Sequence, residues 1–286
     1  MQLLIPCFFS CIFSCLTREI VMSRKNFTLL AITGRQFIPL FYKPFLHKEG
    51  KITPESILKK LKIERAFGKH STSPRILSIA QPTEVGTVYS IEELSKLSEL
   101  CKAENLFFHI DGSRLYNAVA YLKISLEEIV KAAQVDILSL GGTKNGLMGA
   151  EALLIFNPNL EIGSDHLQKQ TLQLLSKMRY LSSQHIPFFK DELWRTLALQ
   201  ANEKAQEIAS IIKMIPKLSL SYSVETNQIF FTAPKSWVPL IQDEIFCYPW
   251  DQEKNEIRFI TSWNTSKQDI TDIASILIKI SNTTGQ

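Results

Sequence analysis

The sequence predicts an α/β protein: a large domain with a mostly parallel sheet, followed by a smaller C-terminal α/β domain. Three observations support this prediction. Short apolar runs alternate with amphipathic helical segments between residues 75 and 156, two long segments with few helix breakers follow, and short strand patterns come after them. Strands that alternate with helices form βαβ units, whose parallel strands lie side by side through right-handed crossovers.

The composition is that of an ordinary globular protein. The chain has 286 residues, of which 45% are hydrophobic and 21% are charged, so one large or two modest domains are expected. These values exclude a disordered chain, collagen, a disulfide-stabilised mini-protein and a polytopic membrane protein. The net charge is +4 and no run of Lys or Arg forms a basic stripe, so we expect no nucleic-acid partner.

The first predicted strands and helices lie between residues 75 and 160. Arg75–Ala80 predicts a buried strand, and a loop follows over residues 81–89. A capping box of Ser90 and Glu93 begins a helix that runs to about Glu104. The elements expected next are a strand at Leu106–Ile110, a short helix from the Ser125 and Glu128 capping box to about Ala133, a strand at Val135–Leu140, and a strand at Ala152–Phe156 that ends before Pro158.

The pattern changes after Pro158. Long helices are expected over His166–Ser182 and Lys190–Met214 because these segments contain few helix breakers. Strand patterns follow at Leu218–Ser223, Gln228–Thr232 and Glu256–Thr261, and a last helix runs from near Ser266 to about Ile280. These elements predict a smaller α/β domain after a helical connection.

The N-terminal segment is apolar. Met1 to Thr17 carry no charge, but a membrane-spanning helix needs about 20 apolar residues and this run contains Pro6. A secretory signal places its basic residues before the apolar run, whereas Arg18 follows it. We therefore expect no clear membrane partner and a cytoplasmic protein, although a weak membrane anchor stays an alternative.

The cysteines suggest neither disulfides nor metal. Five cysteines are an odd number, and no CxxC or CxH spacing points to zinc, so no metal ligand is assigned. Cys7, Cys11 and Cys15 would share one face of a helix. A thiol or lipid site is one interpretation, and a chance run in an apolar leader is the favoured one.

Two loops follow strands at the edge of the sheet where ligands bind in open α/β folds, beyond the carboxyl ends of the strands. They are His109-Ile-Asp-Gly-Ser-Arg114 and Gly141-Gly-Thr-Lys-Asn-Gly146. Because they follow neighbouring βα units, we expect Asp111 and Lys144 to approach one another. Five of the eleven glycines of the chain also fall in this window, at positions 112, 141, 142, 146 and 149.

A carboxylate and a lysine at one sheet edge allow two interpretations. The first is a surface ion pair, worth about 0–1 kcal/mol, which spacing alone favours. The second is a pyridoxal phosphate site, in which the lysine amine forms a Schiff base with the cofactor aldehyde. A carboxylate beside the pyridine nitrogen would keep that nitrogen protonated, and the glycines would let a flat ring come close to the backbone.

The two motifs favour the second interpretation. His109–Arg114 and the run Asp136-Ile-Leu-Ser-Leu-Gly-Gly-Thr-Lys-Asn-Gly146 resemble the low-specificity L-threonine aldolases, of the aromatic amino acid β-eliminating lyase/threonine aldolase family. Further similar stretches are Gly50–Glu55, Gln81–Tyr89, Gln173–Arg179 and Ile257–Trp263. The resemblance extends from about Ile32 to the C-terminus. Another lyase or a transaminase of the same fold is less favoured by the Gly-Gly-Thr-Lys-Asn-Gly run.

The resemblance implies a fold and a reaction. The fold would be the pyridoxal phosphate-dependent transferase-like fold type I, with pyridoxal 5'-phosphate as cofactor. The reaction would be retro-aldol cleavage of L-threonine or L-allo-threonine, a small amino-acid substrate, to glycine and acetaldehyde. Intact members of the family form homo-oligomers, dimers or tetramers.

The resemblance also implies roles for single residues. By matching motif, Lys144 would be the Schiff-base lysine and Asp111 the partner of the pyridine nitrogen. Arg114 would lie near the phenolic oxygen and the substrate carboxylate. Arg258 would grip that carboxylate, a task that suits the planar fork of a guanidinium. Without the resemblance, Arg258 would be read as a surface arginine on a strand. His109 shares the side of its strand with Asp111 and is expected to support the site rather than act as a base.

The N-terminal part differs from the family. Intact members carry a longer N-terminal section, with a loop that binds the cofactor phosphate and a histidine that stacks on the pyridine ring, and neither is found before Asp111. We therefore expect a truncated or altered chain, divided into an apolar leader (1–30), a remnant of the cofactor-binding large domain (31–160), a helical connection (161–190) and a small C-terminal domain (191–286). The alternative function is a catalytically inactive remnant without the phosphate-binding loop. Gln81, Thr83 and Glu84 stay unassigned.

Overall fold

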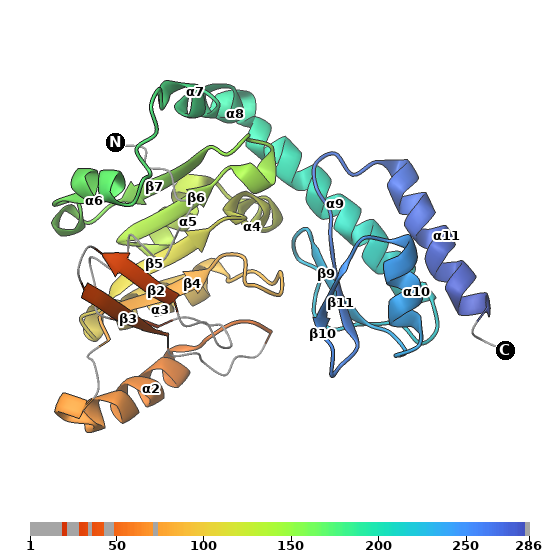
Figure 1. Cartoon of the computed structure of the whole chain (residues 1–286), viewed down its shortest axis with the longest axis horizontal. Helices are drawn as coiled ribbons and strands as arrows, with labels where there is room; N and C mark the ends of the chain where they lie inside the picture. Colours follow the sequence, from red (N-terminus) through yellow and green to blue (C-terminus); the bar gives the residue numbers. More distant parts are fainter. Residues whose placement is uncertain (1–18, 22–28, 34–35, 43–48, 71–73, 284–286) are drawn as a thin grey trace.

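The computed structural model describes residues 19–21, 29–33, 36–42, 49–70 and 74–283. These residues form two sheets that are joined by one long helix (Figure 1). The whole apolar run of residues 1–17, with its three cysteines, lies outside the described residues. The strands of the larger sheet, in chain order, are β1 Glu19–Val21, β2 Leu29–Thr33, β3 Gln36–Tyr42, β4 Ile76–Ala80, β5 Phe107–Gly112, β6 Ile137–Gly141 and β7 Glu151–Ile155.

The larger sheet is mostly parallel, as predicted. Its strand order is β2-β3-β1-β4-β5-β6-β7, and the central pairings from β3 through β6 are parallel. The edge strands β2 and β7 are antiparallel to their neighbours. The reason for β7 is the connection from β6, which contains only residues 142–150 and no crossover helix, so the chain must return in the opposite direction.

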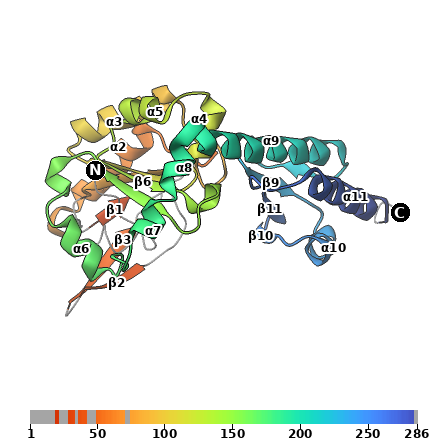
Figure 2. The same cartoon turned by 90° about the horizontal axis from the view of Figure 1, so that it is seen from above.

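Helices cover this sheet where the sequence predicts them. Ser90 and Ser125 cap α3 (Ile91–Ala103) and α5 (Leu126–Ala133), and both capping boxes are complete. Figure 2 shows α2 (Pro54–Ala66), α3 and α5 along one side of the sheet. Apolar side chains of the strands and helices form one continuous core between them, for example Leu77, Leu94 and Phe108. Burial of this apolar area is the main force that holds the layers together.

One predicted helix is wrong. His166–Ser182 is not a single helix: α6 (Ser164–Gln170) ends after two turns, and α7 (Arg179–Ser182) begins only after an irregular segment. Leu172 and Lys177 in that segment both have φ near +61°, a left-handed conformation that an α-helix cannot contain. The sequence there has no Gly or Pro to indicate the break, and the short helices α4 (Leu115–Leu122) and α8 (His185–Phe189) were also not predicted.

The smaller sheet has the order β10-β11-β9-β8 and is antiparallel throughout. Its strands are β8 Ser219–Leu220, β9 Gln228–Thr232, β10 Tyr248–Asp251 and β11 Glu256–Ile260, and α10 (Trp237–Glu244) and α11 (Lys267–Thr283) pack with it. The predicted strand at Gln228–Thr232 is confirmed residue for residue, whereas the strand predicted at Leu218–Ser223 is only two residues long.

Helix α9 (Leu193–Met214) belongs to both parts of the molecule (Figure 1). Trp194 and Ala198 at its start pack in the core of the larger sheet, and Ala205 and Ile208 further along pack in the core of the smaller one. The predicted domain boundaries stay a prediction: α9 begins just after the boundary at residues 190–191, yet its first turns pack with the larger sheet.

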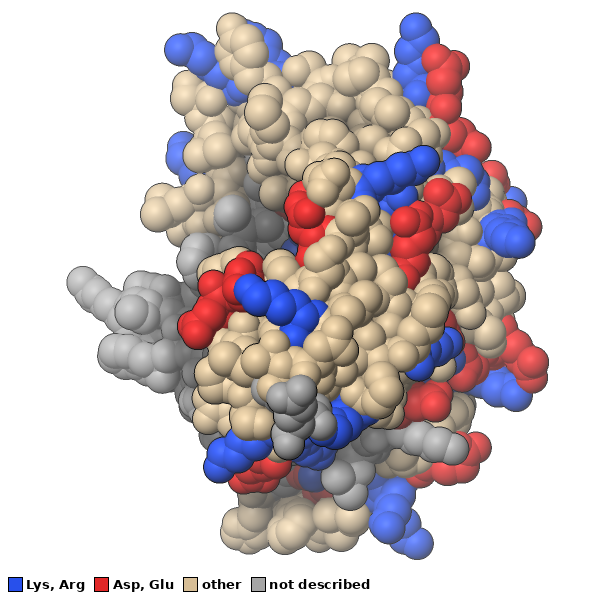
Figure 3. Space-filling model, turned by 90° about the vertical axis from the view of Figure 1, so that its right-hand side faces the viewer, with Lys and Arg blue, Asp and Glu red and all other residues tan. Residues whose placement is uncertain are grey.

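The surface agrees with the modest net charge. On the face shown in Figure 3, Lys and Arg alternate with Asp and Glu, and no continuous basic surface is seen. Within the described ranges, every helix is too short or too polar to cross a membrane.

Candidate active site

Asp111 and Arg114 lie at the carboxyl end of β5, as predicted. Asp111 is paired in register with Ala80 of β4 and Ser139 of β6, so it is in the middle of the parallel strands. Its Oδ1 accepts a hydrogen bond from the Ser113 backbone N–H at 2.9 Å, which orients the carboxylate. Arg114 follows as the residue that precedes α4, and its side chain is half-buried.

Lys144 lies in the 3₁₀ turn η2 (Thr143–Asn145), directly after β6. Two polar side chains that the sequence analysis did not single out hold this turn. Glu151 of β7 accepts the Thr143 N–H at 3.1 Å, and the buried Asn145 amide donates to the Trp194 carbonyl at the start of α9, at 3.0 Å. The turn is therefore fixed to both β7 and α9.

Glycines give this turn its close packing. A Cβ at Gly142 would overlap Leu147 Cδ1 and would lie 2.5 Å from the Ala150 carbonyl oxygen. Gly146 has φ +111° and lies against the side chains of Leu197 and Trp263. At position 142 only glycine avoids these overlaps without a shift of the backbone. At position 146 glycine adopts the positive φ without strain.

Lys144 interacts electrostatically with the two other predicted residues of this sheet edge, Asp111 and Arg114. Its side chain is exposed at the mouth of the site, but enough protein surrounds the amine that partial desolvation lowers its pKa. The nearby Arg114 lowers the pKa of Lys144 further, while Asp111, Glu84 and Glu151 oppose this effect. The structure therefore brings Lys144, Asp111 and Arg114 to one mouth, and it adds Glu84 to them.

His109 is a buried, neutral support. Its Nδ1 lies 2.7 Å from Ser78 Oγ on β4 and its Nε2 lies 3.3 Å from Ser139 Oγ on β6. Complete burial lowers the pKa of His109 to about 3, so the ring is uncharged at neutral pH. The imidazole links three adjacent strands two residues before Asp111, which fits support of the site better than proton transfer.

The loop that follows β4 lies beside Asp111. The Gln81 N–H donates to the Asp111 carbonyl at 2.9 Å, and the buried Gln81 amide closes the loop by two hydrogen bonds to the backbone of Tyr89. Thr83 Oγ1 lies 2.7 Å from Thr87 Oγ1. Gln81 and Thr83, which the sequence left unassigned, therefore brace the loop that carries Glu84.

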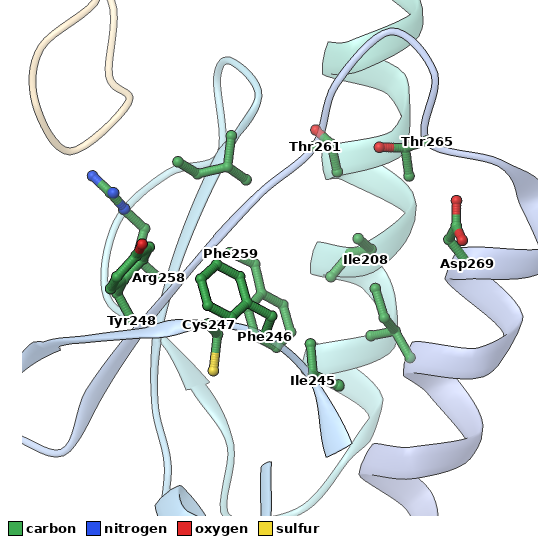
Figure 4. A pocket seen from close by; sticks show the side chains of 12 residues that line it. Ile208, Ile245, Phe246, Cys247, Tyr248, Arg258, Phe259, Thr261, Thr265 and Asp269 are labelled. Carbon is green, nitrogen blue, oxygen red and sulfur yellow. The ribbon is translucent and has the colours of Figure 1, made fainter. Parts of the chain in front are cut away.

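Arg258 lies on β11 of the smaller sheet. Its guanidinium lies 4.8 Å from the centre of the Trp250 ring, a cation–π contact that orients the side chain. Figure 4 shows a hollow of about 340 Å³ between the sheet and helices α9 and α11, lined by side chains such as Ile208 and Phe259. Arg258 lies at the rim of this hollow and points away from its apolar interior.

The comparisons with known proteins identify the family. Residues 25–234 match the family model described as beta-eliminating lyase. This chain belongs to the beta-eliminating lyase family. It is 35% identical over 226 residues to a low-specificity L-threonine aldolase of Pseudomonas sp., and 36% identical over 225 residues to one of Pseudomonas aeruginosa. Each alignment covers 79% of this chain. The chain is thus similar to threonine aldolase-type lyases of that family.

A solved structure supports the fold. The threonine aldolase of Leishmania major superimposes with a TM-score of 0.82 and 25% identity, over 95% of this chain and 81% of that one. The fold is thus the predicted fold type I of pyridoxal phosphate enzymes. The chain spans 65% and 64% of the lengths of the two Pseudomonas relatives.

The residues at the mouth fit the family's cofactor, pyridoxal 5'-phosphate. A lysine with a lowered pKa suits the aldehyde, because only the neutral amine is a nucleophile. An oriented carboxylate suits the pyridine nitrogen, and a guanidinium suits an oxyanion. Among the described helices ahead of Asp111, α2 and α3 both begin with complete capping boxes, so neither has the N-terminus of a phosphate-binding loop.

Proposed function

We propose that this chain holds pyridoxal 5'-phosphate on Lys144 and cleaves L-threonine or L-allo-threonine to glycine and acetaldehyde. The observation that carries the proposal is the arrangement of Lys144: its amine has a lowered pKa and shares one sheet edge with Asp111 and Arg114. The Pseudomonas relatives, which bear the name of this activity, support the choice of substrate. The predicted homo-oligomer and cytoplasmic location stay predictions.

In this proposal each residue has one task. When bound, the cofactor supplies an electron-accepting ring that withdraws charge from the substrate Cα. Asp111 keeps a proton on the ring nitrogen, and its hydrogen bond from the Ser113 N–H fixes the carboxylate for that contact. Arg114 and Arg258 bind the substrate carboxylate, and the Trp250 ring holds Arg258 in position.

Lys144→Ala tests the proposal. We expect borohydride treatment of the cofactor-loaded wild-type chain to fix the cofactor covalently on the peptide that contains Lys144, as seen by mass spectrometry. The variant should lose both this label and the visible absorbance of lysine-bound cofactor. Its threonine cleavage should fall by at least about 10³-fold, because no other amine replaces the nucleophile. Acetaldehyde release is measured by coupled reduction.

Lys213→Ala is the matched control, because Lys213 is an exposed lysine on α9 far along the chain from the site. The Lys213→Ala chain should carry the same borohydride-fixed cofactor label as the wild type. Label that persists in Lys144→Ala would contradict the assignment of the lysine. A wild-type chain that unfolds cooperatively but takes up no label would instead support the second candidate, a chain that keeps the fold without catalysis.

A further inference from the structure

We propose that Glu84 is the group that accepts the proton of the substrate β-hydroxyl, an inference that rests on the proposed function. A retro-aldol cleavage needs such an acceptor, because the carbonyl of the leaving aldehyde forms only as the hydroxyl loses its proton. The resemblance and the comparisons assign this task to no residue of this chain.

The backbone presents Glu84 at the tip of a tight turn. The Gly86 N–H donates to the Thr83 carbonyl at 2.9 Å, and the Thr83 N–H donates to the Thr87 carbonyl at 2.8 Å. Glu84 is thus the second residue of a closed four-residue turn. Gly86 has φ +86°, and a Cβ there would lie 3.0 Å from Gln228 Cβ, so the turn is packed tightly against β9.

This turn lies between the two places where an amino acid would be held. On one side, Gln81 at the start of the loop is hydrogen-bonded to the Asp111 backbone, beside Lys144. On the other side, Thr226 Oγ1 donates to the Gly86 carbonyl at 2.9 Å, and Glu225 accepts the Val88 N–H at 2.6 Å. Residues 225–227 lead into β9, the strand next to the Arg258 strand β11.

The Glu84 carboxylate interacts with the Lys144 amine across the mouth. Its negative charge is one of the three that stabilise the Lys144 ammonium, beside those of Asp111 and Glu151. If the α-amino group of a substrate lies at Lys144 and its carboxylate at Arg258, its Cβ falls between them, where the Glu84 turn connects the Asp111 strand to β9.

The other titratable groups close to Asp111 and Lys144 in the described part of the chain have different tasks. Asp111 is oriented for the ring nitrogen, and Glu151 accepts a backbone N–H of the lysine turn. His109 is completely buried, uncharged, and held between two serine hydroxyls. Glu84 is the candidate that remains, because its loop is tied to both Asp111 and the residues before β9, and its charge acts on Lys144.

The proposed step balances without another reactant. The Glu84 carboxylate takes the β-hydroxyl proton, the C–O bond becomes a carbonyl, and the Cα–Cβ bond breaks. The electron pair of that bond would stay on Cα, whose charge the bound cofactor would withdraw until Cα takes up a proton from water and glycine forms. Glu84 then returns its proton to water, so nothing is oxidised or reduced.

Glu84→Gln tests the proposal, because the amide keeps the shape of the side chain but cannot accept the proton as a carboxylate does. We expect kcat for threonine to fall by at least about 10²-fold, the usual contribution of such a group. Exchange of the glycine α-protons with deuterated solvent, followed by NMR, should stay within about threefold of the wild type, since that reaction involves no β-hydroxyl. Cofactor uptake by absorbance and the urea unfolding midpoint of the cofactor-free chain should not change.

Two further variants sharpen the test. Glu84→Asp keeps a carboxylate and should be at least about tenfold more active than Glu84→Gln. Glu225→Gln removes a negative charge from the anchor of the same loop, yet its amide oxygen can still accept the Val88 N–H, so near wild-type cleavage is expected.

The outcomes separate the two proposals. Cleavage by Glu84→Gln within about threefold of the wild type would overturn the role of Glu84, and so would an equal loss of cleavage and glycine exchange. A wild-type chain that binds cofactor and exchanges glycine protons but cleaves no threonine would overturn the proposed function, and the role of Glu84 with it.

Discussion

At the residue scale, burial decides which groups at this sheet edge carry charge. Lys144 and His109 lie on adjacent strands or at their ends, and burial lowers the pKa of both side chains. Lys144 stays at the mouth, where three carboxylates oppose the effect and where its amine is accessible for chemistry. His109 lies completely inside the sheet and stays neutral. Their surroundings thus suit Lys144 to a reactive task and His109 to a structural one.

The buried His109 predicts a pH dependence of stability. Its pKa is about 3 in the folded chain and about 6.5 when unfolded, so the unfolded state binds the extra proton as pH falls. The folded state should therefore lose about 2 kcal/mol of stability through this residue between pH 7.5 and pH 5. Urea unfolding of wild type and His109→Gln at both pH values isolates the effect, because the glutamine does not titrate. An equal pH dependence of the two proteins would show that His109 contributes none of it.

At the element scale, the turn after β6 depends on a glycine for steric reasons alone. Gly142 has an ordinary φ of −99°, but a Cβ there would lie far closer than the 3.0 Å that real Cβ atoms keep from their neighbours. Ala150 contributes a backbone oxygen to this contact, and backbone yields less easily than a side-chain end. A methyl group must therefore displace the turn, and Lys144 moves with it.

Gly142→Ala should consequently weaken uptake of the cofactor by at least about tenfold, a loss of about 1.4 kcal/mol, as measured by titration of the absorbance of lysine-bound cofactor. Gly149→Ala is the matched control in the same connection. Gly149 has φ +77° but nothing within 4 Å of the added methyl group, so the variant costs about 1 kcal/mol of stability and leaves Lys144 in place. Equal uptake by the two variants would refute the steric argument.

At the scale of the whole molecule, α9 connects the two cores. Its first turns pack with the larger sheet through Trp194, and its later turns pack with the smaller sheet through Ile208. Between them, the Ala201 carbonyl accepts the Thr261 hydroxyl at 2.7 Å, three residues after Arg258. The position of the Arg258 strand relative to Lys144 therefore depends on this helix.

Ala201→Pro should destabilise the chain by about 3 kcal/mol or more, since proline removes an α-helical hydrogen bond and clashes with the preceding turn. Ala201→Gly should cost only about 1 kcal/mol and leave one cooperative transition. Urea unfolding followed by circular dichroism measures both. A proline variant as stable as the glycine variant would show that the two cores do not depend on continuity of α9.

Much of this fold could be predicted from local patterns. The capping boxes at Ser90 and Ser125 predict helices that the structure contains, and the apolar run at Gln228–Thr232 predicts its strand. The segment at residues 166–182 could not be predicted, because its break depends on left-handed residues that carry ordinary side chains. The antiparallel direction of β7 follows from its short connection to β6, which contains no crossover helix.

The sequence by itself determined the family, and it predicts Lys144, Asp111 and Arg114 as the cofactor residues because they lie in two short motifs that resemble those of the family. Only the tertiary structure decided which distant groups join them. Glu84, Glu151, Trp194 and Trp250 come from separate elements, and their sequence neighbours give no indication of the contacts they make. The physical reason is that a charge or hydrogen bond acts over a few ångströms of space, whatever the separation along the chain.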